Sequence, residues 1–476
     1  MQPLWSSSEL SAALGVGAEG GAGAAVTGVS IDTRTLQAGD LFVALKDQRD
    51  GHHFVSTAFK AGAAAALVGA SYSRQVGDGA LFRVADTLKG LEALGRAARQ
   101  RLSSEARIVG VTGSAGKTGT KEMLRACLAR LGATHASEKS YNNHWGVPLT
   151  LARMPRDTLF GVFEIGMNHA GEIRPLTKMV GPDAAIITTV EPVHLEHFPS
   201  VAEIADAKAE IFEGLPKGGA AIIKYDNPHA DRLKAIAEKL GAKPVTFGFN
   251  AGADVQGLDF RSSDDGSDMT VRIGGSNFAV HLAIPGRHIA ENALAVAAAL
   301  YFIGVDVATA LTALADLAPP SGRGARSTLY IGGGEALLID ESYNANPASM
   351  KAALATLGAV PRQKYSRRIA VLGDMLELGS EAPALHTSLK GDVDEAEVDL
   401  VFACGQHMKG LYDALPAAKK GGYALTSSSI EATLAGNLRA GDVVMVKASN
   451  GTRLGPVVAA LKTQFGKDGP AAKPAW

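Results

Sequence analysis

A glycine-rich turn between a predicted strand and a predicted helix constrains this chain more than any other part of its sequence. Residues 108–112 are an apolar run, and residues 113–118, Gly-Ser-Ala-Gly-Lys-Thr, follow directly. From Met123 to Leu131, apolar residues then recur at helical spacing. Glycines allow backbone N–H groups to close around an anion, and the N-terminus of a helix adds a favourable dipole. The stretch therefore predicts a phosphate-binding loop.

Lys117 and Thr118 carry the side chains that such a loop requires. Lys117 would neutralise phosphate charge, and the Thr118 hydroxyl would bind Mg²⁺. The loop departs from the pattern G-x-x-x-x-G-K-[ST], because Val111 stands at the position of the first glycine. The alternative is a tight turn that happens to carry a lysine. The sequence Gly-Lys-Thr between a strand and a helix favours phosphate binding over this alternative.

Length and composition limit the possible classes of protein. A chain of 476 residues is too long for one ordinary core, so we expect several domains. Hydrophobic residues make up 46% and charged residues 20%, which is typical of globular proteins. A net charge of −1 provides no general field for nucleic acid or membrane, so an anionic ligand must meet local groups. No signal peptide or membrane span is evident, and we expect a cytoplasmic protein with Cys127 and Cys404 as buried free thiols.

The order of predicted elements divides the chain into three α/β units, which we place at residues 1–104, 105–319 and 320–476. In the central unit, strands at 108–112, 159–165, 184–190 and 220–224 alternate with helices, which indicates a doubly wound parallel sheet. Residues 251–283 alternate with period two, which predicts a small antiparallel addition. In the last unit, we expect strands at 337–340, 368–372, 400–403 and 443–447, again with helices between them, which predicts a Rossmann-like sheet.

Three charged or titratable residues stand out in the central unit. Ligands of doubly wound sheets bind beyond the carboxyl ends of the strands. Glu164 ends one strand, and a carboxylate there is costly unless it is paired or binds a metal, so we expect a Mg²⁺ ligand. His194 follows the next strand, so it is a second candidate for ligand contact, although it could instead be a surface histidine. Lys208 lies on the apolar stripe of a helix that begins with a capping box, Ser200 to Glu203. It could be a desolvated amine near the phosphates, or a lysine that snorkels to solvent.

Polar stretches elsewhere suggest ligand contacts. Asp32, Thr33 and Arg34 lie next to a strand end and suit a polar ligand, although a solvated Arg–Asp pair is an equal alternative. Residues 141–148 are polar and aromatic and suit ligand contact better than core packing. Asn292 could contact an adenine edge or could cap a helix.

Several stretches together resemble the Mur ligase family, whose members join an amino acid or a dipeptide to a UDP-linked peptidoglycan precursor. Residues 110–118 are similar to the ATP loop of the family. The other similar stretches are NNHWGVPLT at 142–150, EIGMNHAGEI at 164–173, DESYNANPASM at 340–350 and LGDMLELG at 372–379. Residues 32–34 and 39–45 extend the likeness towards the N-terminus.

The resemblance implies an ATP-dependent ligase that adds D-alanyl-D-alanine to UDP-N-acetylmuramoyl-tripeptide through an acyl phosphate. It implies an N-terminal domain for the UDP end of the substrate, a central ATPase domain, two Mg²⁺ ions, and a monomer that binds no nucleic acid. The implied catalytic residues are Lys117, Glu164, His194 and Lys208, with Lys208 as a carbamate. The implied metal ligands are Thr118, Glu164, His194 and the Lys208 carbamate. The implied ATP contacts are Gly113, Ser114, Ala115, Gly116, Lys117, Thr118, Gly119, Asn292, Arg323, Asp340 and Tyr343. The implied substrate contacts are Ser30, Asp32, Thr33, Arg34, Asn142, Asn143 and His144.

Two residues depart from the family pattern, and two other functions remain possible. Gly119 replaces a common threonine, which removes a hydroxyl but not that of Thr118, and Ala115 replaces a common asparagine. One alternative is another ATP-dependent amide ligase of the same architecture, such as a folylpolyglutamate synthase. The other is a nucleotide switch without catalysis, although a switch does not need polar loops at the strand ends of two sheets.

Overall fold

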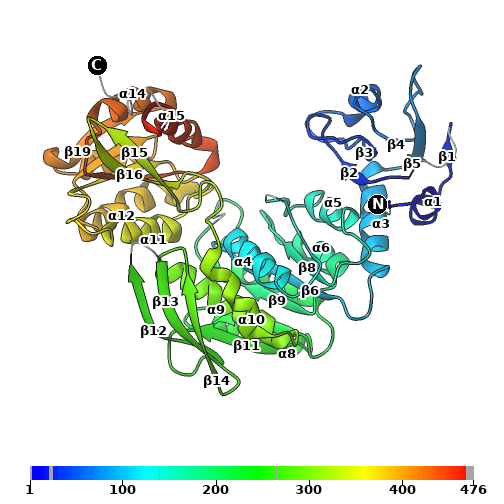
Figure 1. Ribbon diagram of the computed structural model, residues 1–476, viewed down its shortest axis with the longest axis horizontal. Helices are drawn as coiled ribbons and strands as arrows, with labels where there is room; N and C mark the ends of the chain where they lie inside the picture. Colours follow the sequence, from blue (N-terminus) through cyan, green and yellow to red (C-terminus); the bar gives the residue numbers. More distant parts are fainter. Residues whose placement is uncertain (1–2, 21–24, 139, 194, 264–265, 468–476) are drawn as a thin grey trace.

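The structure, a computed structural model, describes residues 3–20, 25–138, 140–193, 195–263 and 266–467. Within these residues the strands form three sheets, which follow one another along the chain. The N-terminal and C-terminal domains stand at opposite ends of the central domain and rise from the same side of it (Figure 1). This arrangement confirms the three-domain α/β fold, while the domain limits at 104/105 and 319/320 stay a prediction.

The N-terminal domain has the strand order β1-β5-β4-β3-β2, in which β1 is antiparallel to β5 and the other neighbours are parallel. Helix α3 starts at the cap Asp86, whose side chain accepts hydrogen bonds from Leu88 and Lys89, and it leads to the central domain (Figure 1). The elements are α1 (Ser7–Leu14), β1 (Ala18–Glu19), β2 (Gly28–Ser30), β3 (Asp40–Val43), η1 (Gly51–Phe54), α2 (Val55–Lys60), β4 (Ala65–Gly69), β5 (Ala80–Val84) and α3 (Thr87–Gln100).

The central domain has the strand order β14-β13-β12-β11-β10-β9-β6-β8-β7. Strands β6 to β12 pair in parallel, and β12, β13 and β14 pair antiparallel, which confirms both the doubly wound sheet and its antiparallel addition. The elements are β6 (Arg107–Thr112), α4 (Lys117–Ala129), β7 (Thr134–Ala136), α5 (Gly146–Ala152), β8 (Phe160–Glu164), α6 (Ile173–Val180), β9 (Ala184–Ile187), α7 (Val201–Ala209), η2 (Glu210–Gly214), β10 (Ala220–Lys224), α8 (Ala230–Lys239), β11 (Lys243–Gly248), β12 (Val255–Ser263), β13 (Gly266–Ile273), β14 (Ser276–Leu282), α9 (Arg287–Phe302), α10 (Val307–Leu311) and η3 (Thr312–Asp316).

The C-terminal domain has the strand order β15-β16-β20-β17-β18-β19, in which only the β15–β16 pair of the described strands is antiparallel. Four of these strands match the expected ones, and β15 and β19 were not expected. The elements are β15 (Ala325–Ile331), β16 (Gly334–Glu341), α11 (Pro347–Gly358), β17 (Arg367–Gly373), η4 (Gly379–Glu381), α12 (Ala382–Glu395), β18 (Leu400–Cys404), α13 (Met408–Ala414), η5 (Ala417–Lys419), β19 (Lys420–Ala424), α14 (Ser427–Asn437), β20 (Asp442–Lys447), η6 (Asn450–Thr452) and α15 (Gly455–Phe465).

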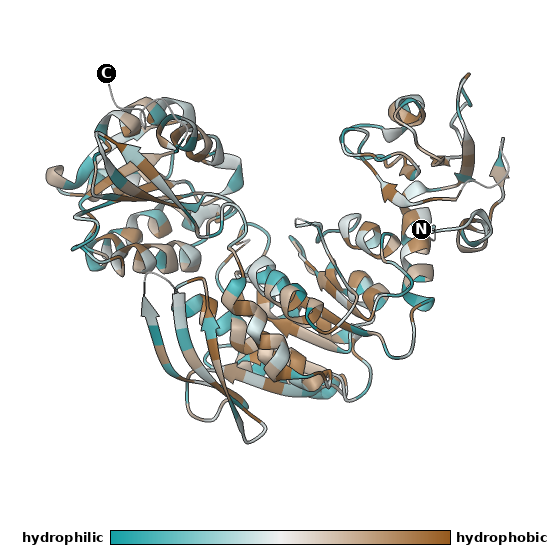
Figure 2. Cartoon of the chain, viewed as in Figure 1, coloured by the Kyte–Doolittle hydropathy of each residue, from teal (hydrophilic) through white to brown (hydrophobic). Residues whose placement is uncertain are grey.

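Apolar strands of the central sheet lie between helices whose polar sides face outward (Figure 2). On one face of the sheet, α4, α9 and α10 pack over one cluster of buried apolar side chains. On the other face, α5 to α8 pack over a second cluster, which continues into the N-terminal domain as far as Trp5 and Leu10. The C-terminal domain has buried clusters of its own on the two faces of its sheet. The N-terminal and central domains therefore share a core, and the C-terminal domain does not.

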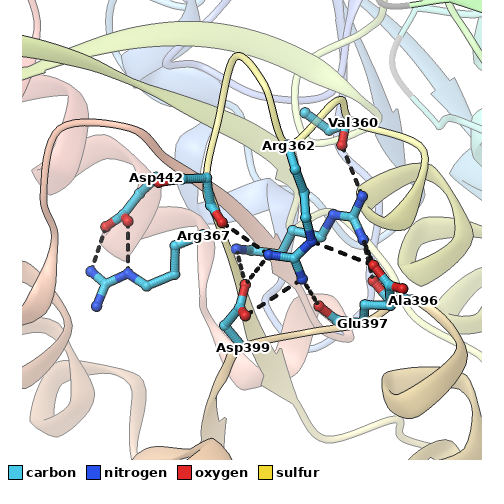
Figure 3. Close-up of polar contacts among 9 residues, drawn as sticks. Val360, Arg362, Arg367, Ala396, Glu397, Asp399 and Asp442 are labelled. Carbon is cyan, nitrogen blue, oxygen red and sulfur yellow. Dashed lines mark hydrogen bonds and ion pairs between the residues drawn. The ribbon is translucent and has the colours of Figure 1, made fainter.

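An arginine–carboxylate cluster stabilises the C-terminal domain at the amino ends of its strands (Figure 3). Arg367 forms two hydrogen bonds with the buried carboxylate of Asp442, at 2.8 and 2.7 Å. Arg362 donates to Asp399 at 3.0 Å, and Arg368 donates to Glu397 at 3.0 Å. Because ligands of such sheets bind at the opposite, carboxyl ends, this cluster has a structural role.

Two further expectations concern the whole chain. Cys127 and Cys404 are both free and buried, as predicted. Among the described residues, no helix has the length and apolar character needed to cross a membrane.

Candidate functional site

A cleft of about 1290 Å³ lies between the central and C-terminal domains, at the carboxyl ends of their strands. Its walls include the predicted phosphate loop from Ser114 to Gly119 and, from the C-terminal domain, Tyr343 to Ser349 and Ser449 to Gly451. Among the described residues, two side-chain contacts are examples of the hydrogen bonds that join the domains across the cleft. The Tyr343 hydroxyl donates to Ser140 Oγ at 2.8 Å, and Asn346 Nδ2 donates to the Ser114 carbonyl at 3.4 Å. The cleft therefore brings loops from both predicted sheets to one place.

The loop from Gly113 to Thr118 joins β6 directly to α4. Gly116 has φ +82° and precedes the helix, and a Cβ there would lie 2.6 Å from Asn292 Oδ1, so only glycine fits. Lys117 Nζ donates to the Gly113 carbonyl at 2.6 Å, and Thr188 Oγ1 donates to the Ala115 carbonyl at 2.5 Å. The loop is thus pre-formed around the N-terminus of α4.

Two lysines lie near this loop: Lys117, which is half-buried, and Lys208, which is buried. Burial lowers the pKa of Lys117, and the Glu164 carboxylate opposes that shift. Burial lowers the pKa of Lys208 well below its ordinary value, and the charge of Lys117 lowers it further. Lys208 lies in the last turn of α7 and is only 2% exposed. The snorkelling alternative is therefore wrong, because a snorkelling lysine keeps its ammonium in water.

Glu164 ends β8 and is 1% exposed. Its two carboxylate oxygens accept hydrogen bonds from Thr118 Oγ1 and from Asn142 Nδ2, each at 2.8 Å. The phosphate loop and the 141–148 stretch therefore meet at one carboxylate. Asn142 contacts Glu164 directly, whereas Asn143 Oδ1 accepts from the Gly146 amide at the start of α5 and His144 is exposed.

Helix α7 starts as expected at Ser200, but the capping box is incomplete. Ser200 Oγ accepts from the Glu203 amide at 3.3 Å, and the second bond of the box, from the Ser200 amide to the Glu203 side chain, is not among those of the described residues.

The predicted nucleotide contacts fall into two groups. Asn292, Arg323 and Tyr343 line the cleft, and the Arg323 guanidinium lies 4.2 Å from the centre of the Tyr343 ring. Helix α9 begins at Arg287, so Asn292 is in its second turn and the capping alternative is wrong. Asp340 lies behind the cleft wall, where it accepts from the Gly322 amide and the Ser342 hydroxyl. Asp340 thus fixes the turn that carries Arg323.

The predicted contacts for the UDP end of the substrate lie away from the cleft. Asp32 and Arg34 form an ion pair with the shortest distance at 2.5 Å, and Ser30 Oγ donates to the Asp32 carbonyl. Thr33 is in the same loop after β2. His194 lies outside the described residues.

Some cleft residues were not singled out in the sequence. Lys447 at the end of β20 is 2% exposed and donates to the Asn344 carbonyl at 2.9 Å. Thr188 and Asn346 bond to the phosphate loop. The signal that identified Glu164, a polar residue at the carboxyl end of an apolar strand, could have identified Lys447 and Thr188.

The donor atoms around Thr118 and Glu164 fit Mg²⁺. This ion prefers oxygen ligands and is commonly bound by one or two carboxylates together with substrate phosphates. Thr118 supplies a hydroxyl and Glu164 a carboxylate, next to the predicted phosphate loop. Among the described residues, no three His, Cys, Asp or Glu side chains form a metal-binding group. These residues thus fit a Mg²⁺ ion whose remaining ligands would come from a bound phosphate.

In a comparison with known protein families, the central and C-terminal domains both match Mur ligase domains. Residues 111–300 match the model of the Mur ligase middle domain, and residues 326–450 match that of the Mur ligase, glutamate ligase domain. A UDP-N-acetylmuramoyl-tripeptide–D-alanyl-D-alanine ligase of Bacillus subtilis is 34% identical over 91% of this chain and 92% of its own.

Solved structures show the same similarity. A crystal structure of MurF from Acinetobacter baumannii has a TM-score of 0.83 and 27% identity, and the match covers 96% of this chain and 99% of that one. A MurF ligase from Thermotoga maritima in complex with ADP has a TM-score of 0.76 and 26% identity, and the match covers 91% and 97% of the two chains. With its phosphate loop, its cleft and a curated relative that matches almost end to end, the chain belongs to the Mur ligase family.

Proposed function

We propose that this chain uses ATP to join D-alanyl-D-alanine to UDP-N-acetylmuramoyl-tripeptide, a step in the synthesis of peptidoglycan precursors. The observation that carries the proposal is the convergence of Lys117, Glu164 and the Tyr343–Asn346 stretch on one cleft between two domains. Relatives with the name of this ligase are similar over most of the chain, which supports the same substrates.

The reaction consists of two transfers. The terminal carboxylate of the tripeptide attacks the γ-phosphate of ATP, so that an acyl–oxygen–phosphorus link forms and the bond to ADP breaks. The free amine of the dipeptide then attacks the acyl carbon, phosphate leaves, and the amine loses a proton. Both steps bring anions together, so they need local positive charge and the exclusion of water.

Named residues of the cleft suit these needs. Lys117 and the N-terminus of α4 would hold the transferring phosphate. Asn292 and Arg323 would contact the nucleotide. Glu164 and Thr118 would hold Mg²⁺, which when bound neutralises phosphate charge. The contacts of the C-terminal domain across the cleft would keep water from the acyl phosphate.

Lys208 would act as a carbamate. Its neutral amine, favoured by burial, can form an N–C bond with CO₂ and release a proton, which leaves an anion. A buried anion is costly unless cations are close, and Lys117 with a metal at Glu164 would supply them. His194, together with this carbamate, would hold a second Mg²⁺.

The remaining proposals concern the rest of the substrate and the state of the protein. The loop with Ser30, Asp32, Thr33 and Arg34 would bind the UDP end of the precursor. Because ATP is a substrate, we propose a cytoplasmic site of action, and a monomer stays a prediction.

The direct test measures ADP release with UDP-N-acetylmuramoyl-tripeptide and D-alanyl-D-alanine, and omits each substrate in turn. We expect release only when all substrates are present, and mass spectrometry should show the addition of two alanines at once. Addition of one residue, or equal release without the precursor, would contradict the proposal. Turnover of folate with glutamate would instead support a folylpolyglutamate synthase, and the absence of ADP release with all substrates present would support a nucleotide switch without catalysis.

A further inference from the structure

Helix α4 carries a second lysine, Lys121, to which the reaction assigns no role. Its side chain is 0% exposed. Its Nζ donates to the Ser137 carbonyl at 2.7 Å and forms an ion pair with Glu122 at 2.6 Å. A buried charge carries a large desolvation cost, and an apolar side chain of similar length would fill the space without that cost. The bonds that Lys121 makes must therefore explain its presence.

Lys121 bonds to Ser137, and Ser137 and the nearby Asn142 both form hydrogen bonds with Glu164. Ser137 follows β7, and its Oγ accepts from the Glu164 amide at 3.4 Å. At the other end of the loop, Asn142 Nδ2 donates to the Glu164 carboxylate, and the Asn142 carbonyl accepts from the Gly166 amide at 2.8 Å. Ser137 thus holds the backbone of Glu164, and Asn142 holds its carboxylate.

The residues after Ser137 are also linked to the other two domains, directly to the C-terminal domain and through Arg153 to the N-terminal domain. Ser140 Oγ accepts the hydrogen bond of Tyr343 from the C-terminal domain. Glu138 pairs with Arg153 at 2.9 Å, and Arg153 Nε donates to the Val29 carbonyl of the N-terminal domain at 2.6 Å. The Lys121–Ser137 bond joins this junction to the helix that carries Lys117 and Thr118.

We infer that Lys121 is a positioning residue for the ligase reaction, which acts by fixing Ser137, so that Ser137 and Asn142 hold Glu164 against Thr118. This inference rests on the proposed function, because it assumes that Glu164 serves the metal. Without the bond from Lys121, Ser137 loses its attachment to α4, and the orientation of the Glu164 carboxylate is less well fixed. Partners that orient a metal ligand typically contribute about 10–100-fold in metal affinity or activity.

The test compares Lys121→Met with Lys121→Arg and with the control Arg125→Met. Arg125 is on the same helix and pairs with the same Glu122, but it is half exposed, and none of its described contacts is with Ser137. We expect Lys121→Met to stay folded, to bind Mn²⁺ in the presence of ADP about 10-fold more weakly by electron paramagnetic resonance, and to lose about 10–100-fold in kcat with a smaller change in the KM for ATP. Lys121→Arg should recover part of both losses, and Arg125→Met should lose neither.

A double-mutant cycle with Asn142→Ala separates positioning from general stabilisation. If Lys121 and Asn142 act together on Glu164, the double variant should be about as slow as the slower single variant. Losses that multiply would overturn the inference, as would Mn²⁺ binding of Lys121→Met equal to that of the wild type.

Folding is the remaining control. Should Lys121→Met not fold, Lys121→Gln, which keeps an N–H donor, takes its place in both measurements, and failure of both variants to fold would make Lys121 a structural residue and overturn the inference. A wild-type protein without ligase turnover would contradict the proposed function instead, and Mn²⁺ binding in the presence of ADP would still report on Lys121.

Discussion

At the scale of single residues, two lysines lie near the predicted phosphate loop: the half-buried Lys117, which lines the cleft, and Lys208, which is 2% exposed. The pKa values of Lys117 and Lys208 are both lowered, in each case mainly by burial. The charge of Lys117 lowers the pKa of Lys208 further, and the charge of Arg323 lowers the pKa of Lys117 further, because like charges in a poorly hydrated place repel. An arriving phosphate would relieve this repulsion at Lys117, and a carbamate would relieve it at Lys208.

The first prediction concerns Lys117. Because its charge should stabilise the transferring phosphate, we expect Lys117→Ala to lower kcat/KM about 100–1000-fold. ADP release in the presence of all substrates measures the effect, and Lys89→Ala, on the exposed side of α3, is the control. Activity of Lys117→Ala within about threefold of wild type would disprove the assignment.

The second prediction concerns Lys208. Lys208→Ala should lose most of its activity and regain part of it with formate or acetate, since a small carboxylate can occupy the place of the carbamate. Mass spectrometry under native conditions should detect the added CO₂ on the wild type and not on the variant. Lys239→Ala, which removes an exposed lysine of α8, should neither lose activity nor respond to formate.

How far the site could be predicted differs from residue to residue. The positions of three residues could be predicted from the hydrophobic pattern, because it marks where a strand ends or a helix begins. These are Lys117 and Thr118 at the start of α4 and Glu164 at the end of β8. The bond of Asn142 to Glu164 was not, because it joins residues 22 positions apart through the loop geometry. The nucleotide contact of Asp340 stays a prediction, and its bonds to the Gly322 and Ser342 amides could not be read from residue type alone.

At the scale of elements, the loop after β17 is fixed by a neutral histidine. His386 in α12 is 0% exposed, and its Nε2 accepts from the Met375 amide at 2.9 Å. Its Nδ1 lies 2.6 Å from the Ala382 carbonyl, so Nδ1 carries the proton. Burial lowers the pKa of His386, and the Ala382 carbonyl and Asp374 oppose the shift, while nearby His407 adds to it.

The third prediction is a pH dependence. Below about pH 6.5, His386 is protonated in the unfolded chain but stays neutral in the folded protein, because its folded-state pKa is lowered. The free energy of unfolding therefore falls as the pH drops from about 6.5 towards the lowered pKa. His386→Gln cannot titrate, so its deficit in stability relative to wild type should be smaller at about pH 5.5 than at about pH 8. Urea unfolding at the two pH values measures this deficit. An equal deficit at both would show that His386 is protonated, or unprotonated, in both states.

Most elements were predictable, and the exceptions have a physical cause. The apolar strands of the central sheet, such as β6 and β9, are buried on both faces and read as continuous apolar runs. Strand β19 lies at the edge of its sheet, is only half-buried and contains two glycines, so its sequence carries little of this pattern. Helix α9 begins at Arg287, five residues before Asn292, and Gly286 rather than Asn292 is its N-cap.

At the scale of the whole molecule, the domains form two bodies. Trp5 joins the N-terminal domain to the central one: its Nε1 donates to the Ala152 carbonyl at 2.8 Å, and the Arg101 guanidinium lies 3.8 Å from its ring centre. Arg101 also donates to the Leu4 and Met154 carbonyls. The C-terminal domain meets the rest mainly through polar contacts, so we expect it to move as a unit.

The fourth prediction tests this division. Trp5→Ala should lower the stability of the shared core by about 3–5 kcal/mol, because it removes a fully buried aromatic side chain. Hydrogen exchange should then speed up in both α3 and α5 and stay unchanged in β17 and β20. Leu425→Ala, at a side chain 68% exposed, is the control. Faster exchange confined to the N-terminal domain would show that the two domains do not share a core.

The arginine cluster of Figure 3 has a consequence for inherited variation. Its ion pairs and the cleft occupy opposite ends of the same strands, so a substitution at one end seldom reaches the other. Changes at Arg367 or Asp442 would lower the number of folded molecules in a cell, while the kcat of each folded molecule stays unchanged. Changes at the cleft would leave the number of molecules intact and slow each one. Two mutant alleles with the same growth defect could thus be told apart by protein abundance, and only the first kind would be relieved by making more of the protein.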